Sequence, residues 1–232
     1  MPKNSSRPGK RPSHKSRNIH LEIYQHLLSH FGARNWWPAQ SPFEVMVGAI
    51  LTQNTSWRNV ERAINNLRRA GALSPKKLAE IDLRELEELI RPSGYFRQKA
   101  IRLKIFLEFL LAPPISGSIK KMKKIETGRM REMLLSVKGI GPETADSILL
   151  YALGKPVFVV DAYTRRIFSR LGLVAEKIGY EELRAFFETY LPKDTALFND
   201  YHAQLVALGN QYCKKRALCK ECPLLYFRKC KI

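Results

Sequence analysis

The 232-residue sequence has no apolar stretch long enough to cross a membrane. Its most apolar run, residues 148–160, is interrupted by Gly154, Lys155 and Pro156, whereas a span needs about 20 consecutive apolar residues. The N-terminal residues are basic and lack the apolar run of a secretory signal. We therefore expect a cytoplasmic protein with no membrane partner.

Acidic residues are scarce relative to basic ones. The chain has 21 Asp and Glu against 40 Lys and Arg, which gives a formal net charge of +19. Such a surplus attracts polyanions, because each phosphate that is neutralised releases condensed counterions. Solubility alone requires far less charge. Nucleic acid is therefore the expected partner, with an anionic membrane surface as the second possibility, and a DNA-binding protein would associate with the nucleoid.

Runs typical of β-strands are almost absent, since only residues 157–160 are rich enough in β-branched side chains. From Ile19 onward, apolar residues recur at helical spacing of three and four. The basic run at residues 120–124 is expected to be a loop. These features predict an all-α fold, with helical patterns over residues 21–28, 46–51, 83–90, 100–111, 128–136, 143–152, 162–171, 180–191 and 200–212.

The first 18 residues lack the apolar side chains needed for a core. They contain six Lys or Arg, three Pro and no acidic residue. This composition is typical of a disordered cationic arm that adds non-specific affinity for DNA.

Cysteine is absent until residue 213, and all four cysteines then fall within eighteen residues. A disulfide framework would be spread along a secreted chain, so this clustering indicates an intracellular protein. Four thiolates this close together favour a metal site over unligated reduced cysteines. The expected ligands are Cys213, Cys219, Cys222 and Cys230.

A glycine turn between two helical segments is the most informative motif. Lys138, Gly139, Ile140 and Gly141 follow one apolar segment, and Pro142 begins the next. Glycines leave backbone N–H groups uncovered, and these amides can bind a DNA phosphate beside a helix N-terminus. A plain connection between two helices is the alternative for a G-x-G pattern taken alone.

The whole segment, LLSVKGIGPETADSILLYALG, resembles the helix-hairpin-helix of the endonuclease III (HhH-GPD) superfamily of DNA glycosylases. The resemblance runs from about Trp36 to Cys222. In that superfamily an aspartate follows the hairpin by some twenty residues, and VFVVDAYTRRIF supplies Asp161. The resemblance implies that Asp161 is catalytic, stabilising an oxocarbenium-like sugar and orienting water. Asp161 is also suited to cap the helix that begins at Ala162.

One departure from the superfamily pattern bears on the reaction. Bifunctional members carry a lysine in the second hairpin helix, which attacks the sugar and forms a Schiff base. Here the motif reads GIGPETA, and Glu143 occupies the lysine position. The resemblance therefore implies a monofunctional enzyme with water as the nucleophile. Glu143 is expected to assist Asp161 or contact the base, or only to stabilise the helix N-terminus.

Further motifs concern the flipped base. In LTQNT the superfamily match implies that Gln53 fills the gap left in the duplex. The stretches WWP and RPSGYFRQKAIRL are similar to type III 3-methyladenine glycosylases, in which aromatic rings matching Trp37 and Trp57 sandwich an alkylated base. A cationic purine suits electron-rich indole faces. Trp36 is a third pocket candidate, with core packing as its alternative.

The C-terminal cysteines also match the superfamily. Their spacing is x5, x2, x7, against x6, x2, x5 in endonuclease III relatives, where the ligand is a [4Fe–4S] cluster. The resemblance implies a structural [4Fe–4S] cluster, and zinc is the alternative given the altered spacing.

We therefore predict a monomeric two-lobed HhH-GPD glycosylase fold that acts on double-stranded DNA containing a damaged, 3-methyladenine-like base. Residues 42–154 would form a helical barrel domain, and residues 19–41 and 155–232 a second lobe with the metal-cluster loop. A mismatch uracil or thymine glycosylase and a non-catalytic DNA-binding protein are the alternatives. A further alternative is an AP-site lyase that uses another lysine.

Overall fold

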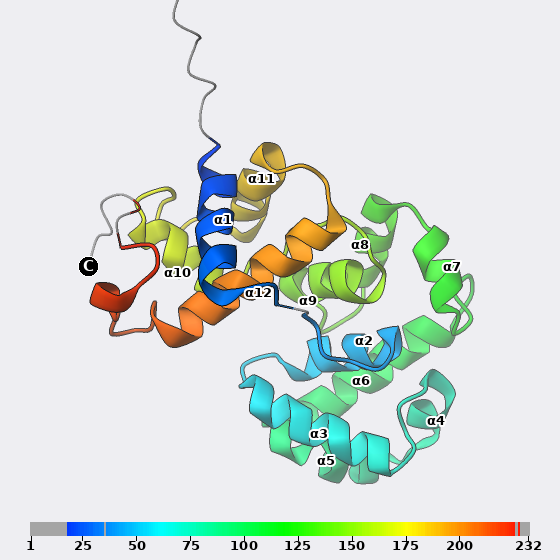
Figure 1. Ribbon diagram of the computed structural model, residues 1–232. Helices are drawn as coiled ribbons and strands as arrows, with labels where there is room; N and C mark the ends of the chain where they lie inside the picture. Colours follow the sequence, from blue (N-terminus) through cyan, green and yellow to red (C-terminus); the bar gives the residue numbers. More distant parts are fainter. Residues whose placement is uncertain (1–17, 35, 226, 228–232) are drawn as a thin grey trace, which may run out of the picture.

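The computed structural model describes residues 18–34, 36–225 and 227, and all regular elements in that part of the chain are helical. The all-α prediction is confirmed (Figure 1). None of the described helices is both long and apolar enough to cross a membrane. In chain order the elements are α1 (Ile19–Phe31), α2 (Pro42–Leu51), α3 (Trp57–Arg69), α4 (Pro75–Glu80), α5 (Leu83–Ile90), η1 (Arg91–Ser93), α6 (Phe96–Leu111), α7 (Ile119–Lys124), α8 (Thr127–Leu135), α9 (Pro142–Ser147), η2 (Ile148–Ala152), α10 (Ala162–Arg170), α11 (Tyr180–Tyr190), α12 (Thr195–Gln211) and η3 (Cys219–Glu221).

Residues 157–160, the run richest in β-branched side chains, are buried and form no strand in the described chain, as expected for one short run without a partner. One expectation about local structure was wrong. The basic run at 120–124 lies in α7, where Ser118 caps the helix and Met122 is fully buried. The arm expected over residues 1–18 lies outside the described residues except for Asn18, which caps α1.

Two apolar cores divide the molecule. The first contains buried residues between 43 and 157 and is enclosed by α2–α9, which we call the barrel lobe. The second combines Ile23 and Leu27 of α1 with buried residues between 150 and 224. Its helices, α1, α10, α11 and α12, form what we call the terminal lobe. Figure 1 shows the two groups side by side.

Helix α2 lies at the centre of the barrel lobe. Ser41 caps it, Pro42 takes the first turn, and every residue from Phe43 to Leu51 is buried. It contacts α3, α6, α9 and η2. Because α2 is held on all sides, the segment that follows it, with Gln53, begins from a rigid position.

The continuous helical stretch α9–η2 joins the lobes. Ile148 and Leu149 belong to the first core, and Leu150 belongs to the second. The fully buried Asp146 of α9 accepts bonds from Arg131 at 2.7 and 3.2 Å and from the Tyr180 hydroxyl at 2.9 Å. A buried carboxylate needs such partners, so this network fixes α9 against α8 and α11.

Candidate active site and DNA interface

The hairpin connects α8 to α9 as the sequence indicated. Gly139 has φ +95°, and a Cβ there would lie 2.6 Å from Cγ of Arg102, so both backbone conformation and space require glycine. Ile140 is buried and anchors the turn in the first core, while Lys138 and Gly141 are exposed. Gly141 caps α9 and Pro142 is its first residue. The turn thus presents a basic side chain and an uncovered backbone to solvent.

Gln53 lies directly against this hairpin. Its side-chain nitrogen donates to the Gly139 carbonyl at 3.1 Å and to the Thr144 hydroxyl at 3.0 Å. Its carbonyl oxygen accepts from Arg102. The structure therefore brings two motifs 86 residues apart into one surface. Gln53 is held by protein partners here, and filling a gap in DNA requires it to exchange them.

A buried lysine supports the segment that carries Gln53, and sequence reasoning missed it. Lys99 is 1% exposed, and its ammonium donates to the carbonyls of Leu51 at 2.8 Å and Ser93 at 2.7 Å. Burial lowers the pKa of Lys99 to about 8, and the nearby Arg102 charge contributes. Lys99 ties the end of α2 to η1, next to the exposed ring of Tyr95. The sequence feature that could have identified Lys99 is a lysine among the apolar residues of α6.

Asp161 lies at the N-terminus of α10, where it serves as the helix cap. Its Oδ1 accepts from the Thr164 amide at 2.7 Å and hydroxyl at 2.9 Å, while Oδ2 is 3.6 Å from His202 Nε2. Burial alone would raise the pKa of this carboxyl group. The interaction with His202 and the Thr164 bonds outweigh burial, so the pKa of Asp161 is lowered and the group stays ionised.

Glu143 lies near Asp161, and it occupies the hairpin position at which a bifunctional relative would have lysine. The residue reaches solvent at the start of α9, yet burial of its carboxyl group raises its pKa to about 7, and the negative charge of Asp161 contributes. Charge interactions with His202 and Arg165 act in the opposite direction. A carboxyl group that changes charge near neutral pH, beside an ionised one, is typical of catalytic sites.

The three tryptophans gather as the sequence suggested, but not as a sandwich. The ring centroids of Trp37 and Trp57 are 5.1 Å apart with planes at 89°, and Trp36 is 5.2 Å from Trp57. The ring of Trp37 packs against α2, and a Cβ atom at Gly48 would lie 3.2 Å from it. The rings of Trp37 and Trp57 meet edge to face, so a base can enter between them only if they separate.

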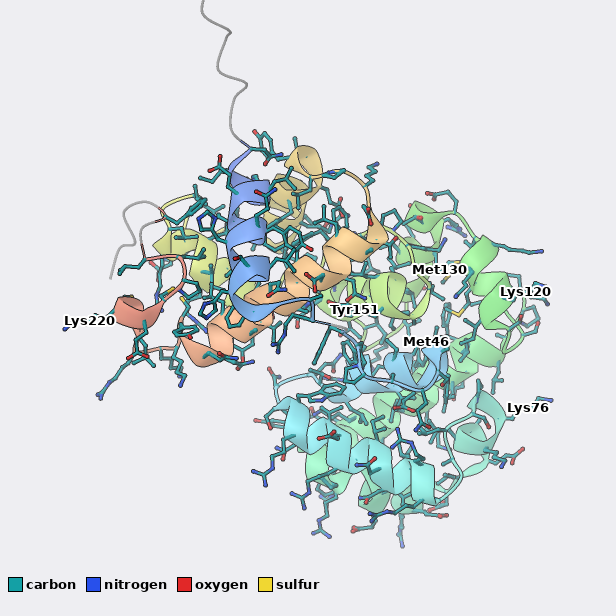
Figure 2. All side chains as sticks on the ribbon, viewed as in Figure 1. Met46, Lys76, Lys120, Met130, Tyr151 and Lys220 are labelled. Carbon is teal, nitrogen blue, oxygen red and sulfur yellow. The ribbon has the colours of Figure 1, made fainter. Side chains whose placement is uncertain are left out.

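Tyr151 connects the tryptophans with the carboxylates, a role that no sequence pattern indicated. Its ring lies 5.3 Å from Trp37, and its hydroxyl forms a hydrogen bond with Nδ1 of His202, the residue that faces Asp161. Figure 2 shows Tyr151 at the junction of the two lobes. Aromatic pocket and carboxylates thus form one continuous site.

The three described cysteines line one small cavity in the terminal lobe, together with apolar side chains such as Leu208 and Leu224. Arg170 donates to the Cys213 sulfur at 3.3 Å. Burial raises the pKa of the Cys222 thiol, and Cys213 and Cys219 act in the same direction. Over the described residues, no three His, Cys, Asp or Glu side chains are arranged to hold a metal ion. Cys230 lies outside that part of the chain.

Comparisons with known proteins agree with this geometry. The family model of HhH-GPD superfamily base excision DNA repair proteins matches residues 47–193. A Methanocaldococcus jannaschii protein, provisionally named a DNA repair glycosylase, is 50% identical over 208 residues, which are 89% of this chain and 94% of the relative. Endonuclease III of Thermotoga maritima is 31% identical over 78% of this chain and 79% of its own.

Among solved structures, H. pylori 3-methyladenine DNA glycosylase (MagIII) bound to 1,N6-ethenoadenine aligns with a TM-score of 0.71 and 32% identity. The alignment covers 83% of this chain and 97% of that one. The chain belongs to the HhH-GPD superfamily of base excision DNA repair proteins, and it is a DNA glycosylase with the two-lobed fold of that superfamily. Its partner is DNA.

Proposed function

We propose that the protein is a monofunctional glycosylase that hydrolytically removes an N-alkylated, 3-methyladenine-like base from double-stranded DNA. The observation that carries the proposal is the ionised, half-buried Asp161 in one continuous site with the indole rings of Trp37 and Trp57. Glu143, rather than an amine, stands at the hairpin position beside it.

Base recognition would depend on the aromatic residues. Indole faces attract a cationic purine, and this attraction strengthens when water is excluded. The base would enter between Trp37 and Trp57 as their edge-to-face contact opens, with the Trp36 ring close to both. The similar H. pylori glycosylase, described with a bound modified adenine, supports a modified purine as the substrate class.

Binding to the duplex would position the target without reading sequence. The amides around Gly139 and Gly141, with Lys138, would bind a phosphate, while Gln53 would leave its partners on the hairpin and fill the gap left by the flipped base. Phosphate contacts of this kind give affinity that depends on salt rather than on sequence.

The chemistry then needs little from the protein beyond Asp161. The bond between the sugar C1′ and the base nitrogen breaks, and its electron pair neutralises the positive charge of the alkylated base. The carboxylate of Asp161 stabilises the cationic sugar, as carboxylates do in other glycosidic cleavages. Water adds to C1′, and its proton passes to Asp161 and then to solvent. No step requires a covalent amine intermediate, which agrees with Glu143 at the lysine position.

For the cysteines we propose a structural [4Fe–4S] cluster held by Cys213, Cys219, Cys222 and Cys230, with zinc as the alternative. Support for this proposal comes from the three described thiols, which line one cavity, and from the Arg170 cation beside Cys213; the described thiols are not themselves arranged to hold a metal ion. When bound, the metal group would hold the basic C-terminal segment in place without taking part in base removal. Analysis of iron, acid-labile sulfide and zinc in anaerobically purified protein distinguishes the two metals.

The test of the proposed activity is base release from methylated duplex DNA, with strand nicking measured in parallel. Free 3-methyladenine with strands intact until alkali supports the proposal. Strand cleavage with a borohydride-trapped complex would overturn the monofunctional assignment. Release of uracil or thymine from mismatches alone would establish a pyrimidine substrate. Duplex binding with no release from any substrate would establish a non-catalytic protein. Light scattering of the same preparation tests the proposed monomer.

A further inference from the structure

Tyr151 lies where two parts of the candidate site meet. It lies in η2, the stretch that passes from the first core to the second, and its ring packs against both. On one side is Trp37, with ring centroids 5.3 Å apart, and on the other is His202 at 5.9 Å. The link from base pocket to Asp161 therefore runs through Tyr151 and His202.

The proton positions along this link follow from the available partners. In the described chain, Nδ1 of His202 is the one acceptor for the Tyr151 hydroxyl, and burial raises the pKa of Tyr151 well above its usual value. The hydroxyl therefore keeps its proton and donates to Nδ1. A neutral imidazole that accepts at Nδ1 carries its own proton on Nε2.

In the described chain, the carboxylate of Asp161 is the acceptor that faces the Nε2 proton of His202. Nε2 of His202 is buried and has no hydrogen-bond partner, and Asp161 Oδ2 lies 3.6 Å away. A buried N–H without an acceptor is costly, and hydrogen bonds in catalytic sites often shorten only when substrate binds. The other oxygen of Asp161 is already held by Thr164. The Nε2–H group of His202 is therefore placed to donate to Oδ2 of Asp161 and to fix the orientation of this carboxylate.

We propose that Tyr151 and His202 are positioning residues for base removal: Tyr151 fixes the tautomer of His202, and His202 holds the Asp161 carboxylate in its reactive orientation. This inference rests on the proposed function. It also connects the two halves of the site, because Trp37 contacts both Trp57 and the ring of Tyr151. Glu143 and Arg165 are the other charged groups near this pair.

Three variants separate this role from simple packing. Tyr151→Phe removes only the hydroxyl and keeps the ring against Trp37. His202→Leu removes the donor toward Asp161, whereas His202→Gln places an amide N–H at a similar distance from the backbone. In single-turnover excision we expect a loss of about tenfold for Tyr151→Phe and about 10- to 100-fold for His202→Leu. His202→Gln should stay within about threefold of the wild type.

Two further readouts separate the positioning role from a merely structural one. Affinity for a duplex with an abasic-site analogue should be unchanged in all three variants. The acid limb of the excision rate should shift to higher pH in His202→Leu, because the Asp161 carboxylate loses a group that favours its ionised form, and it should stay in place in His202→Gln. Tyr151→Phe and His202→Gln decide the question if His202→Leu does not fold.

Asp161→Asn serves as the reference in the same assay. If the wild type releases no base, the proposed function fails. If the wild type is active and Asp161→Asn is not, while His202→Leu keeps its rate within twofold and its pH profile, only the positioning role fails. Equal losses in His202→Gln and His202→Leu would also overturn it, because the donor would then be irrelevant.

Discussion

The side-chain amide of Gln53 and the hydroxyl of Thr144, 3.0 Å apart, join the end of α2 to the second helix of the hairpin. Two elements that would contact different parts of a duplex are therefore in register before DNA arrives. Together with the bond from Gln53 to the Gly139 carbonyl, this contact makes Gln53 part of the free protein's structure as well as a candidate to enter the duplex.

Replacement of Gln53 by alanine is expected to weaken binding to an abasic-site duplex about tenfold, because nothing then fills the gap. Fluorescence anisotropy measures the affinity. Asn66→Ala is the control, since the Asn66 side-chain amide also donates to the backbone, at 2.9 Å to the Leu89 carbonyl, away from the hairpin. Equal affinities for the two variants would exclude Gln53 from the interface.

Gly139→Ala should cost more stability than Gly154→Ala. Both glycines have positive φ, +95° and +67°, but only the Cβ at 139 would meet Arg102, at 2.6 Å. We expect an extra loss of about 1–2 kcal/mol for Gly139→Ala in denaturant unfolding. Arg102→Ala in the same chain should recover part of it, and full additivity would argue against the overlap.

Asp161→Asn should lower the excision rate by at least about 100-fold, while DNA binding persists. Asparagine can still cap α10 through Thr164, so the melting temperature should change little. Excision within a few-fold of the wild type would remove Asp161 from the mechanism.

The pKa of Glu143, about 7, gives a pH dependence with a definite sign. Above that pH the carboxylate is ionised and attracts a cationic base, so KM for an alkylated purine should fall between pH 6 and pH 8. The trend should be absent in Glu143→Gln and with an uncharged modified adenine. A KM that rises over this interval in the wild type would contradict the assigned role.

His20 predicts loss of stability in acid. It is 2% exposed among the rings of Phe186, Phe187 and Tyr190, and burial lowers its pKa from 6.5 to about 4. The unfolded chain binds the proton first, so stability is full above pH 6.5 and falls as pH drops toward 4, by on the order of 3 kcal/mol.

Urea unfolding at pH 7 and pH 5 measures this effect. The difference between the two pH values should be smaller in His20→Phe than in the wild type. His26→Phe, on the exposed face of the same helix, is the control and should keep the wild-type difference. An unchanged difference in His20→Phe would assign the acid sensitivity to other groups.

Much of the fold follows from helical spacing, because a helix buries one face and repeats it every three to four residues. The long patterns at 83–90 and 180–191 became α5 and α11. α7 was missed because its lysines conceal the single buried Met122 that holds it. Residues 157–160 fill the core without forming a strand, in agreement with the all-α prediction.

The candidate site could be predicted from the sequence where its functional residues lie within one local motif. Gly139 has the positive φ that its turn requires, and Asp161 caps α10 as expected. The link between Tyr151 and His202 was not predictable, because 51 residues and a lobe boundary separate them in sequence. Nor could spacing reveal that Trp37 and Trp57 meet edge to face.

The division of the cores has a consequence for how the chain assembles during synthesis. The first core is drawn from a continuous segment, so the barrel lobe can bury its apolar residues as soon as residue 157 has left the ribosome. The second core needs α1 together with residues up to Leu224, so α1 must wait for the C-terminal end. Asp161 and His202 belong to this late part. The nascent chain would therefore complete its hairpin before it acquires the carboxylate that acts on the sugar.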